Sequence, residues 1–148
     1  MSDDLTIREM TEDDREVWLE MYAALFPNES KTGMNIEISR ILSSTKRAGY
    51  CALRSDAIMG FAEYNIRDFA NGCVSQPVPF LEGVWVRPEV RSQGIAKALI
   101  LHLVRTARNQ GFTEFGSDVL MENDQSLAMH KRLGFEETER VVYFRKDI

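Results

Sequence analysis

The spacing of apolar and polar positions divides the chain into helical and extended segments. Apolar residues recur at helical spacing until Gly111 stops the pattern, which predicts a helix over 94–109. The run 80–86 is apolar on both alternating faces except at Glu82, as in a strand inside a sheet, and Gly83 indicates a bulge or a close backbone approach. The other predicted elements are strands over 5–8, 50–53, 58–66, 113–119 and 141–144, and helices over 11–26, 35–47 and 123–133.

The order of these elements predicts an α/β fold. It reads strand, two helices, three strands, helix, strand, helix, strand, so its middle contains a strand-helix-strand crossover. A chain of 148 residues, 44% of them hydrophobic, has the usual size of one globular core, and we expect a single domain over 1–148. Such sheets bind ligands at glycine-bearing junctions between strand and helix. The junction at 87–94 is therefore the first candidate site.

Charge and cysteine content limit the kinds of ligand and partner that we expect. The 18 basic and 23 acidic residues give a net charge of −5 without a basic block, which argues against nucleic acid as the main partner and suits a cationic ligand if the acids cluster. Cys51 and Cys73 have neither disulfide-framework nor metal-ligand spacing, so we expect reduced thiols and no metal. No apolar stretch is long enough for a signal or membrane segment, and a cytoplasmic location with no membrane partner is expected.

The loop before the helix over 94–109 has the layout of an anion site. A tight turn that enters a helix can hold a phosphate, because the first N–H groups of the helix are unpaired. No Lys-Ser/Thr pair follows Gly94, and no three-glycine dinucleotide pattern is present. A phosphate donor here is therefore expected to be neither a nucleoside triphosphate nor a nicotinamide dinucleotide. An ordinary strand-to-helix turn is the alternative.

The segment "RSQGIA" at 91–96 resembles the pyrophosphate-binding signature of the GNAT superfamily of N-acetyltransferases, and the segments around Arg87 and over 123–135 resemble the acyl-CoA region of the same family. The resemblance implies a mixed central sheet flanked by helices, with splayed strands at the acyl-CoA site. It also implies acetyl-CoA as co-substrate, with a strand over 84–86 that pairs with pantetheine through its backbone. The implied cofactor-binding residues are Val84, Trp85, Val86, Arg91, Ser92, Gln93, Gly94, Ile95, Ala96, Lys97 and Asn123.

One position departs from the family pattern. The family usually carries a tyrosine seven residues after the asparagine, as the proposed acid for the leaving thiolate, and here that position is His130. Imidazole can donate a proton near neutral pH, so His130 is a catalytic candidate, although a histidine on such a helix is more often a packed residue. His102 lies away from the apolar stripe of its own helix and is expected to face solvent.

A narrower resemblance concerns the acceptor. The segments 71–73, 75–83, 117–118 and 134–143 resemble a subgroup of aminoglycoside 6'-N-acetyltransferases, which implies an antibiotic-modifying enzyme that confers resistance. Aminoglycosides carry several ammonium groups, so their site needs fixed carboxylates. The candidate acceptor-binding residues are Phe26, Glu82, Asp118, Glu136 and Glu139. Plain core packing of Phe26 and a solvated surface position for Glu136 are the alternatives.

The expected mechanism is direct attack in a ternary complex. Glu82, acting through a water, is the first candidate for the base that deprotonates the acceptor ammonium, and Asp118 is the second. A covalent route through Cys51 or Cys73 is the rival chemistry. An acetyltransferase of a polyamine or a peptide N-terminus and a non-catalytic acyl-CoA-binding module are the other functions left open. The family resemblance also implies a homodimer, in which the strand over 141–144 pairs across the interface or stays internal.

Overall fold

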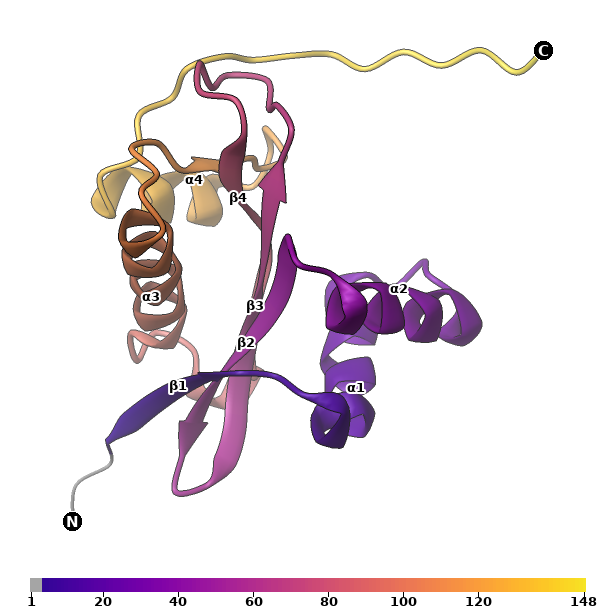
Figure 1. The fold of residues 1–148 in the computed structure, drawn as a ribbon, viewed down its shortest axis with the longest axis vertical. Helices are drawn as coiled ribbons and strands as arrows, with labels where there is room; N and C mark the ends of the chain where they lie inside the picture. The colour runs from indigo at the N-terminus through magenta and orange to yellow at the C-terminus, as the bar shows by residue number, and fades with distance from the viewer. Residues whose placement is uncertain (1–3) are drawn as a thin grey trace.

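A computed structural model describes residues 4–148 and shows a twisted five-stranded sheet with helices on both faces (Figure 1). The strands lie side by side in chain order. The first four pair antiparallel, and the fifth is parallel to the fourth. The expected α/β fold with a mixed sheet is therefore confirmed. The strands are β1 (Leu5–Glu9), β2 (Arg47–Arg54), β3 (Ala57–Arg67), β4 (Val78–Val86) and β5 (Gly116–Ser117).

Two pairs of helices bury the two faces of the sheet. α1 (Arg15–Leu25) and α2 (Lys31–Ser43) lie on one side, and α3 (Ile95–Asn109) and α4 (Asp124–Arg132) lie on the other (Figure 1). The 3₁₀ turns η1 (Glu12–Asp14) and η2 (Pro88–Val90) precede α1 and follow β4. The core under α1 and α2 contains Trp18, Met21, Ile38, Ile41 and Phe61. The core under α3 contains Ala52, Ala62, Leu99, Ile100 and Leu103.

The second helix differs from its predicted range of 35–47. It begins at Lys31 because the hydroxyl oxygen of Ser30 accepts the N–H of Gly33 and caps the first turn. It ends at Ser43 because the hydroxyl of Ser44 accepts the N–H groups of the residues two and three positions later and turns the chain into β2. The first residues of the helix were thus predicted as a turn, and its predicted last turn is a loop over 44–46 followed by the first residue of β2.

The strand β4 contains the predicted irregularity. Its register against β3 shifts between Glu63 and Tyr64, so Glu63 is opposite Gly83 while Tyr64 is opposite Leu81. A Cβ at Gly83 would lie only 2.9 Å from a methyl group of Leu25 on α1. Both predictions for this glycine are therefore confirmed: it lies at a bulge, and α1 approaches it closely.

The end of the chain differs most from its prediction. No strand forms over 141–144; instead, residues 136–148 form an arm that passes Gly72 at Thr138 and Glu139 and then runs away from the folded body (Figure 1). Val142 and Phe144 are 77% and 91% exposed. The apolar run expresses a preference for extended backbone, but a strand also needs a partner edge. The predicted strand over 113–119 is likewise reduced to the two residues of β5.

Candidate functional site

The strands β4 and β5 separate after a short paired stretch. They pair only where Phe80 is opposite Gly116 and Leu81 is opposite Ser117. Beyond these pairs, the β5-facing edge of β4 has no strand partner among residues 4–148. An unpaired strand edge presents backbone N–H and C=O groups that can bind an extended ligand. We call the gap between the two strands beyond Leu81 and Ser117 the β4–β5 opening.

The loop from β4 to α3 has the geometry of an anion-binding turn. Ser92 and Gly94 adopt positive φ angles of 64° and 82°, and α3 begins directly after Gly94. Within the described chain, no side chain caps the first turn of α3, so its N–H groups and the positive end of the helix dipole are free to meet an anion. Phosphate is the anion that such turns commonly hold.

Two arginines brace this loop against the sheet. Arg91 donates from Nε to the carbonyl oxygen of Val86 at 2.9 Å, and its guanidinium lies 5.9 Å from the centre of the Trp85 ring. Arg54 donates to Oε1 of Gln93 at 2.7 Å. The loop is therefore held in place by the protein itself. Sequence reasoning missed Arg54, because it precedes Gln93 by 39 positions and belongs to another strand.

The predicted cofactor-binding residues differ in what they can offer a ligand. The side chains of Val86 and Ile95 are buried in the core, so only their backbone groups are available. Val84 and Ala96 also pack against the core under α3. The exposed side chains of the loop are those of Arg91, Ser92, Gln93 and Lys97. Binding here would thus combine backbone groups of β4 with polar side chains of the loop.

α4 carries two further candidates. Asn123 caps it, because its Oδ1 accepts the N–H of Ser126 at 3.1 Å. His130 lies on the last turn, half-buried, with its ring edge-on to Phe135 at 5.1 Å between centroids. Its Nε2 is 2.7 Å from the hydroxyl oxygen of Ser117, and its Nδ1 is 2.7 Å from the carbonyl oxygen of Ser126. The ring is therefore bound at both nitrogens.

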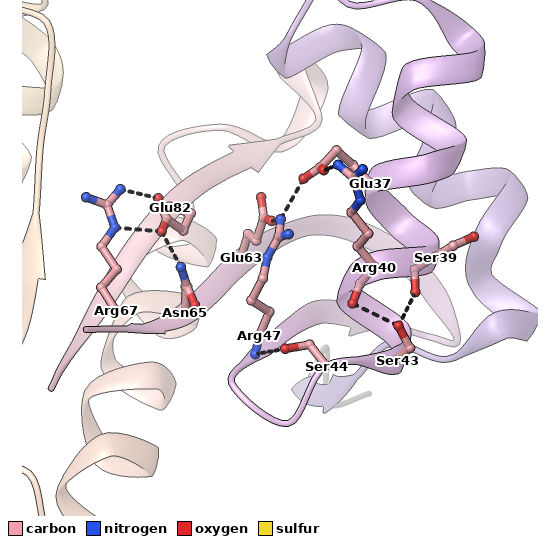
Figure 2. Close-up of polar contacts among 10 residues, drawn as sticks. All are labelled: Glu37, Ser39, Arg40, Ser43, Ser44, Arg47, Glu63, Asn65, Arg67 and Glu82. Atoms are coloured by element: carbon pink, nitrogen blue, oxygen red, sulfur yellow. Dashed lines mark hydrogen bonds and ion pairs between the residues drawn. The ribbon is translucent and has the colours of Figure 1, made fainter. Parts of the chain in front are cut away.

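The bulge in β4 directs Glu82 toward the side of the sheet covered by α1 and α2 (Figure 2). Its Oε2 accepts from Asn65 at 2.9 Å and from Nε of Arg67 at 2.8 Å, and its Oε1 accepts from Nη2 of Arg67 at 2.5 Å. Arg67 also lies over the ring of Phe80, 3.6 Å from its centre. Burial raises the pKa of Glu82, but the hydrogen bonds from Arg67 and Asn65 outweigh it and hold the pKa below its usual value. Glu82 is therefore a fixed carboxylate near neutral pH.

A second acidic group lies on the same face. Glu63 is 3% exposed and accepts from Arg47 at 2.8 Å, and Arg47 also donates to Glu37 on α2 at 2.9 Å (Figure 2). Burial raises the pKa of Glu63 more strongly than the hydrogen bond from Arg47 lowers it. Two ion-pair clusters thus lie on this face, Arg67 with Glu82 and Arg47 with Glu63 and Glu37, and the charge of Glu82 also raises the pKa of Glu63. Sequence reasoning missed Glu63, Arg47 and Arg67, whose partners lie on other elements.

The other predicted acceptor residues occupy different surroundings. Phe26 ends α1 with its ring 4.7 Å from that of Tyr22, and it also lies beside Gly83, next to Glu82. Asp118 is exposed, directly after β5, and contributes to the field that raises the pKa of Arg67. The exposed acids on the arm are Glu136 and Glu139. Phe26 and Glu82 therefore lie close together beside Gly83, whereas Glu136 and Glu139 lie on the surface.

Neither cysteine is suited to nucleophilic chemistry. Cys51 is fully buried, and burial raises the pKa of its thiol. Burial also raises the pKa of Cys73, and the charge of Glu114 adds to the effect. Because the thiolate is the reactive form, both environments disfavour a covalent acetyl-cysteine.

His102 is not the solvent-facing residue that was predicted. It is half-buried, with its ring 5.2 Å from that of Tyr50. Burial lowers its pKa, and the charge of Arg105 adds to this. His102 lies beside the apolar stripe of α3, and the ring of Tyr50 on β2 covers it there.

Residues 4–148 bring together no group of three or more histidine, cysteine or acidic side chains that could hold a metal ion. In the same part of the chain, no helix has the length and apolar character needed to cross a membrane.

The free edge of β4 can pair with an extended ligand, the loop at its end can bind an anion, and the carboxylate at its bulge can bind a cation. A model of the acetyltransferase (GNAT) family matches residues 13–135. The chain belongs to this family.

Several known proteins within this family match the chain over nearly its whole length. The chain is 39% identical over 143 residues to aminoglycoside N(6')-acetyltransferase type 1 of Salmonella enteritidis, covering 96% of this chain and 99% of that protein. It is 40% identical over 138 residues to the protein of that name from Serratia marcescens, covering 92% and 94%. The structure of AAC(6')-Iy in complex with the bisubstrate analogue CoA-S-monomethyl-acetylneamine superimposes with a TM-score of 0.92 at 38% identity, covering 98% and 99%.

Proposed function

We propose that this protein is an aminoglycoside 6'-N-acetyltransferase, which transfers acetyl from acetyl-CoA to the 6'-amine of aminoglycoside antibiotics and so gives resistance. The observation that carries the proposal is the position of Glu82. It is an ionised carboxylate held by Arg67 and Asn65, and it lies where the free edge of β4 begins, directly after Leu81. A polycationic acceptor and an acyl donor can thus meet across β4. The name that the full-length relatives share supports the same substrate class.

The donor side fits coenzyme A. Its pyrophosphate would bind the amides of the loop that ends at Gly94 and the first turn of α3, where helix N–H groups are free. Its pantetheine arm would pair with the free edge of β4 over 82–86. Amides of that edge would polarise the thioester carbonyl, and one such donor contributes roughly 10²–10³ in rate. Acetyl-CoA is a cytoplasmic metabolite, and we place the enzyme there.

The acceptor side supports Glu82 as the first group to receive a proton. A carboxylate has about four lone-pair sites, and Glu82 uses three of them on Asn65 and Arg67. One site on Oε1 remains for a water that takes the proton of the acceptor ammonium. Asp118, exposed and directly after β5, is the second candidate. Phe26 beside Gly83 would pack against a sugar ring, and Glu136 and Glu139 would attract the distal ammonium groups.

Release of the coenzyme A thiol from acetyl-CoA tests the proposal. We expect turnover with kanamycin A and none with paromomycin, which has a hydroxyl in place of the 6'-amine. Spermidine serves as the third acceptor. Turnover only with spermidine would favour a general amine acetyltransferase, and tight coenzyme A binding without turnover would favour a non-catalytic module.

Matched variants test the assignment of the acids. Glu82→Gln and Asp118→Asn should lower kcat, and loss of general base catalysis corresponds to roughly 10²–10⁴-fold. Glu122→Gln, an exposed acid outside the cluster, should leave kcat unchanged. Equal kcat for Glu82→Gln and Glu122→Gln would show that Glu82 does not act as a base in the reaction.

We also propose that the enzyme is a homodimer whose two arms bind reciprocally. The arm beyond Glu139 exposes Val142, Tyr143 and Phe144, although burial of each such side chain is worth about 1.5–3 kcal/mol. A second copy is the fitting occupant, because a two-fold exchange buries both arms at once.

Light scattering at micromolar concentration tests the dimer. We expect twice the chain mass for the wild type, a single chain for Phe144→Asp, and a dimer for Lys146→Asp, which alters the same arm at an exposed charged position. A monomeric wild type would contradict the proposal.

A further inference from the structure

A serine and a histidine lie together where the β4–β5 opening begins. Ser117 is the last residue of β5 and the last to pair with β4, opposite Leu81. The strands separate directly after it, so Ser117 lies at the apex of the space that would receive the thioester. Its hydroxyl oxygen is 2.7 Å from Nε2 of His130 on α4.

The second nitrogen of the ring determines what the first can do. Nδ1 of His130 is 2.7 Å from the carbonyl oxygen of Ser126, which can only accept, so Nδ1 carries a proton. Nε2 is therefore the atom that gains or loses a proton. In the neutral ring, Nε2 accepts the hydroxyl proton of Ser117. In the imidazolium, Nε2–H donates to Oγ, and the hydroxyl proton of Ser117 is free to turn toward the opening.

We propose, on the basis of the acetyltransferase function above, that Ser117 and His130 form a relay that protonates the leaving thiolate of coenzyme A. As the tetrahedral intermediate breaks down, the electron pair of the C–S bond goes to sulfur and sulfur takes the hydroxyl proton of Ser117. Oγ takes the Nε2 proton of the imidazolium, which leaves a neutral ring. Solvent reprotonates His130, and this balances the proton that the acceptor ammonium released through its base.

The groups that contact the ring of His130 are uncharged. It is faced by Ser117 from β5, by Ser126 from its own helix and by the edge of Phe135 after that helix. Asp118, next to Ser117, is the nearest acid along β5 and is exposed. Within residues 4–148, the hydrogen bonds to the ring come from serines and not from a carboxylate. The relay works only while Nε2 carries a proton.

An isosteric pair of variants at Ser117 tests the relay in the full-length protein. Ser117→Thr keeps the hydroxyl and Ser117→Val replaces it with a methyl group of similar size. We expect near wild-type kcat with kanamycin A for the threonine variant and a decrease of about 100-fold for the valine variant. The KM for acetyl-CoA should change less than about threefold in both. The decrease in wild-type kcat at high pH should disappear in Ser117→Val and in His130→Gln.

Thr113→Val is the matched control, because it also removes a hydroxyl near β5 but at an exposed position outside the relay. It should keep both kcat and the high-pH limb, and thermal unfolding would show that each variant is folded. Equal kcat for Ser117→Val and Ser117→Thr, or a high-pH limb that persists in His130→Gln, would overturn the relay. A wild type that does not acetylate kanamycin would instead refute the proposed function.

Discussion

Replacement of Arg67 with methionine separates the two roles of the Glu82 carboxylate. The substitution keeps an unbranched apolar side chain but removes both hydrogen bonds to Glu82 and the guanidinium that lies over Phe80. Burial then acts on Glu82 with only Asn65 and the charge of Arg47 opposing it, so the pKa of Glu82 rises. If Glu82 must be ionised to receive the proton of the acceptor, the acid limb of the kcat/KM profile moves to higher pH. Arg67→Lys, which keeps the charge but not the fork, should move it less.

The structure also bounds the effect on stability. The side chains of Arg67 and Glu82 are 33% and 20% exposed. Removal of one partner from a fully buried pair costs about 3–5 kcal/mol, whereas an exposed pair contributes at most about 1 kcal/mol. We therefore expect Arg67→Met to lower the free energy of unfolding by about 2 kcal/mol at pH 7. Because the pKa of Glu82 is lowered in the folded state, this difference is present above the unfolded-state pKa and diminishes as pH falls through the folded-state value.

Urea unfolding of Arg67→Met, Glu82→Gln and the double variant gives the pairwise coupling, which we expect to be about 1–2 kcal/mol. The pair of Lys46 with Asp68 is the control: it lies nearby, but its side chains are 59% and 85% exposed, and its cycle should give less than about 0.5 kcal/mol. Equal coupling in the two cycles would refute the argument from burial. An acid limb that stays in place in Arg67→Met would show that the titration of Glu82 does not control the reaction.

Three further changes probe the framework around the site. Gly94→Ala should lower the free energy of unfolding by about 1–2 kcal/mol, because alanine is strained at a φ of +82°. A Cβ there would meet nothing within 4 Å, so the strain comes from the backbone alone, and a shift of the loop that relieves it should raise the Kd for coenzyme A. Asp14→Asn should cost about 1–2 kcal/mol at pH 7, and the difference should vanish in acid, because hydrogen bonds from Arg8 hold the pKa of Asp14 below its usual value. Glu114→Gln should lower the Tm, because this carboxylate accepts the backbone N–H groups of Val74 and Ser75 and so holds the loop over 68–77.

The sequence predicted the fold best where a single pattern decided it. The helix expected over 94–109 is α3 (Ile95–Asn109), because its apolar stripe and its flanking glycines agree. The prediction failed at α2, where Ser30 acts as a cap rather than as a loop residue. It also failed over 141–144, because side-chain preference for a strand does not determine which edge, or which chain, provides the partner.

The site was predictable in its residue types more than in its contacts. Glu82 was identified because a lone carboxylate in an apolar strand needs a partner. Its partners Asn65 and Arg67 precede it by 17 and 15 positions and belong to another strand, so only the strand register identifies them. Alternating polar residues at the end of the predicted strand over 58–66 were the available signal.

The bulge in β4 explains how one strand serves both substrates. Leu81 packs under α3, while Glu82 reaches Asn65 and Arg67 on the opposite face, and Gly83 lies under α1 on that same face. Two consecutive residues therefore share one face, which strict alternation does not allow. Without the extra residue, either Glu82 or every side chain after it would move to the wrong side of the sheet. The bulge thus places a carboxylate on the acceptor face while the rest of β4 keeps its core and presents its free edge to the donor.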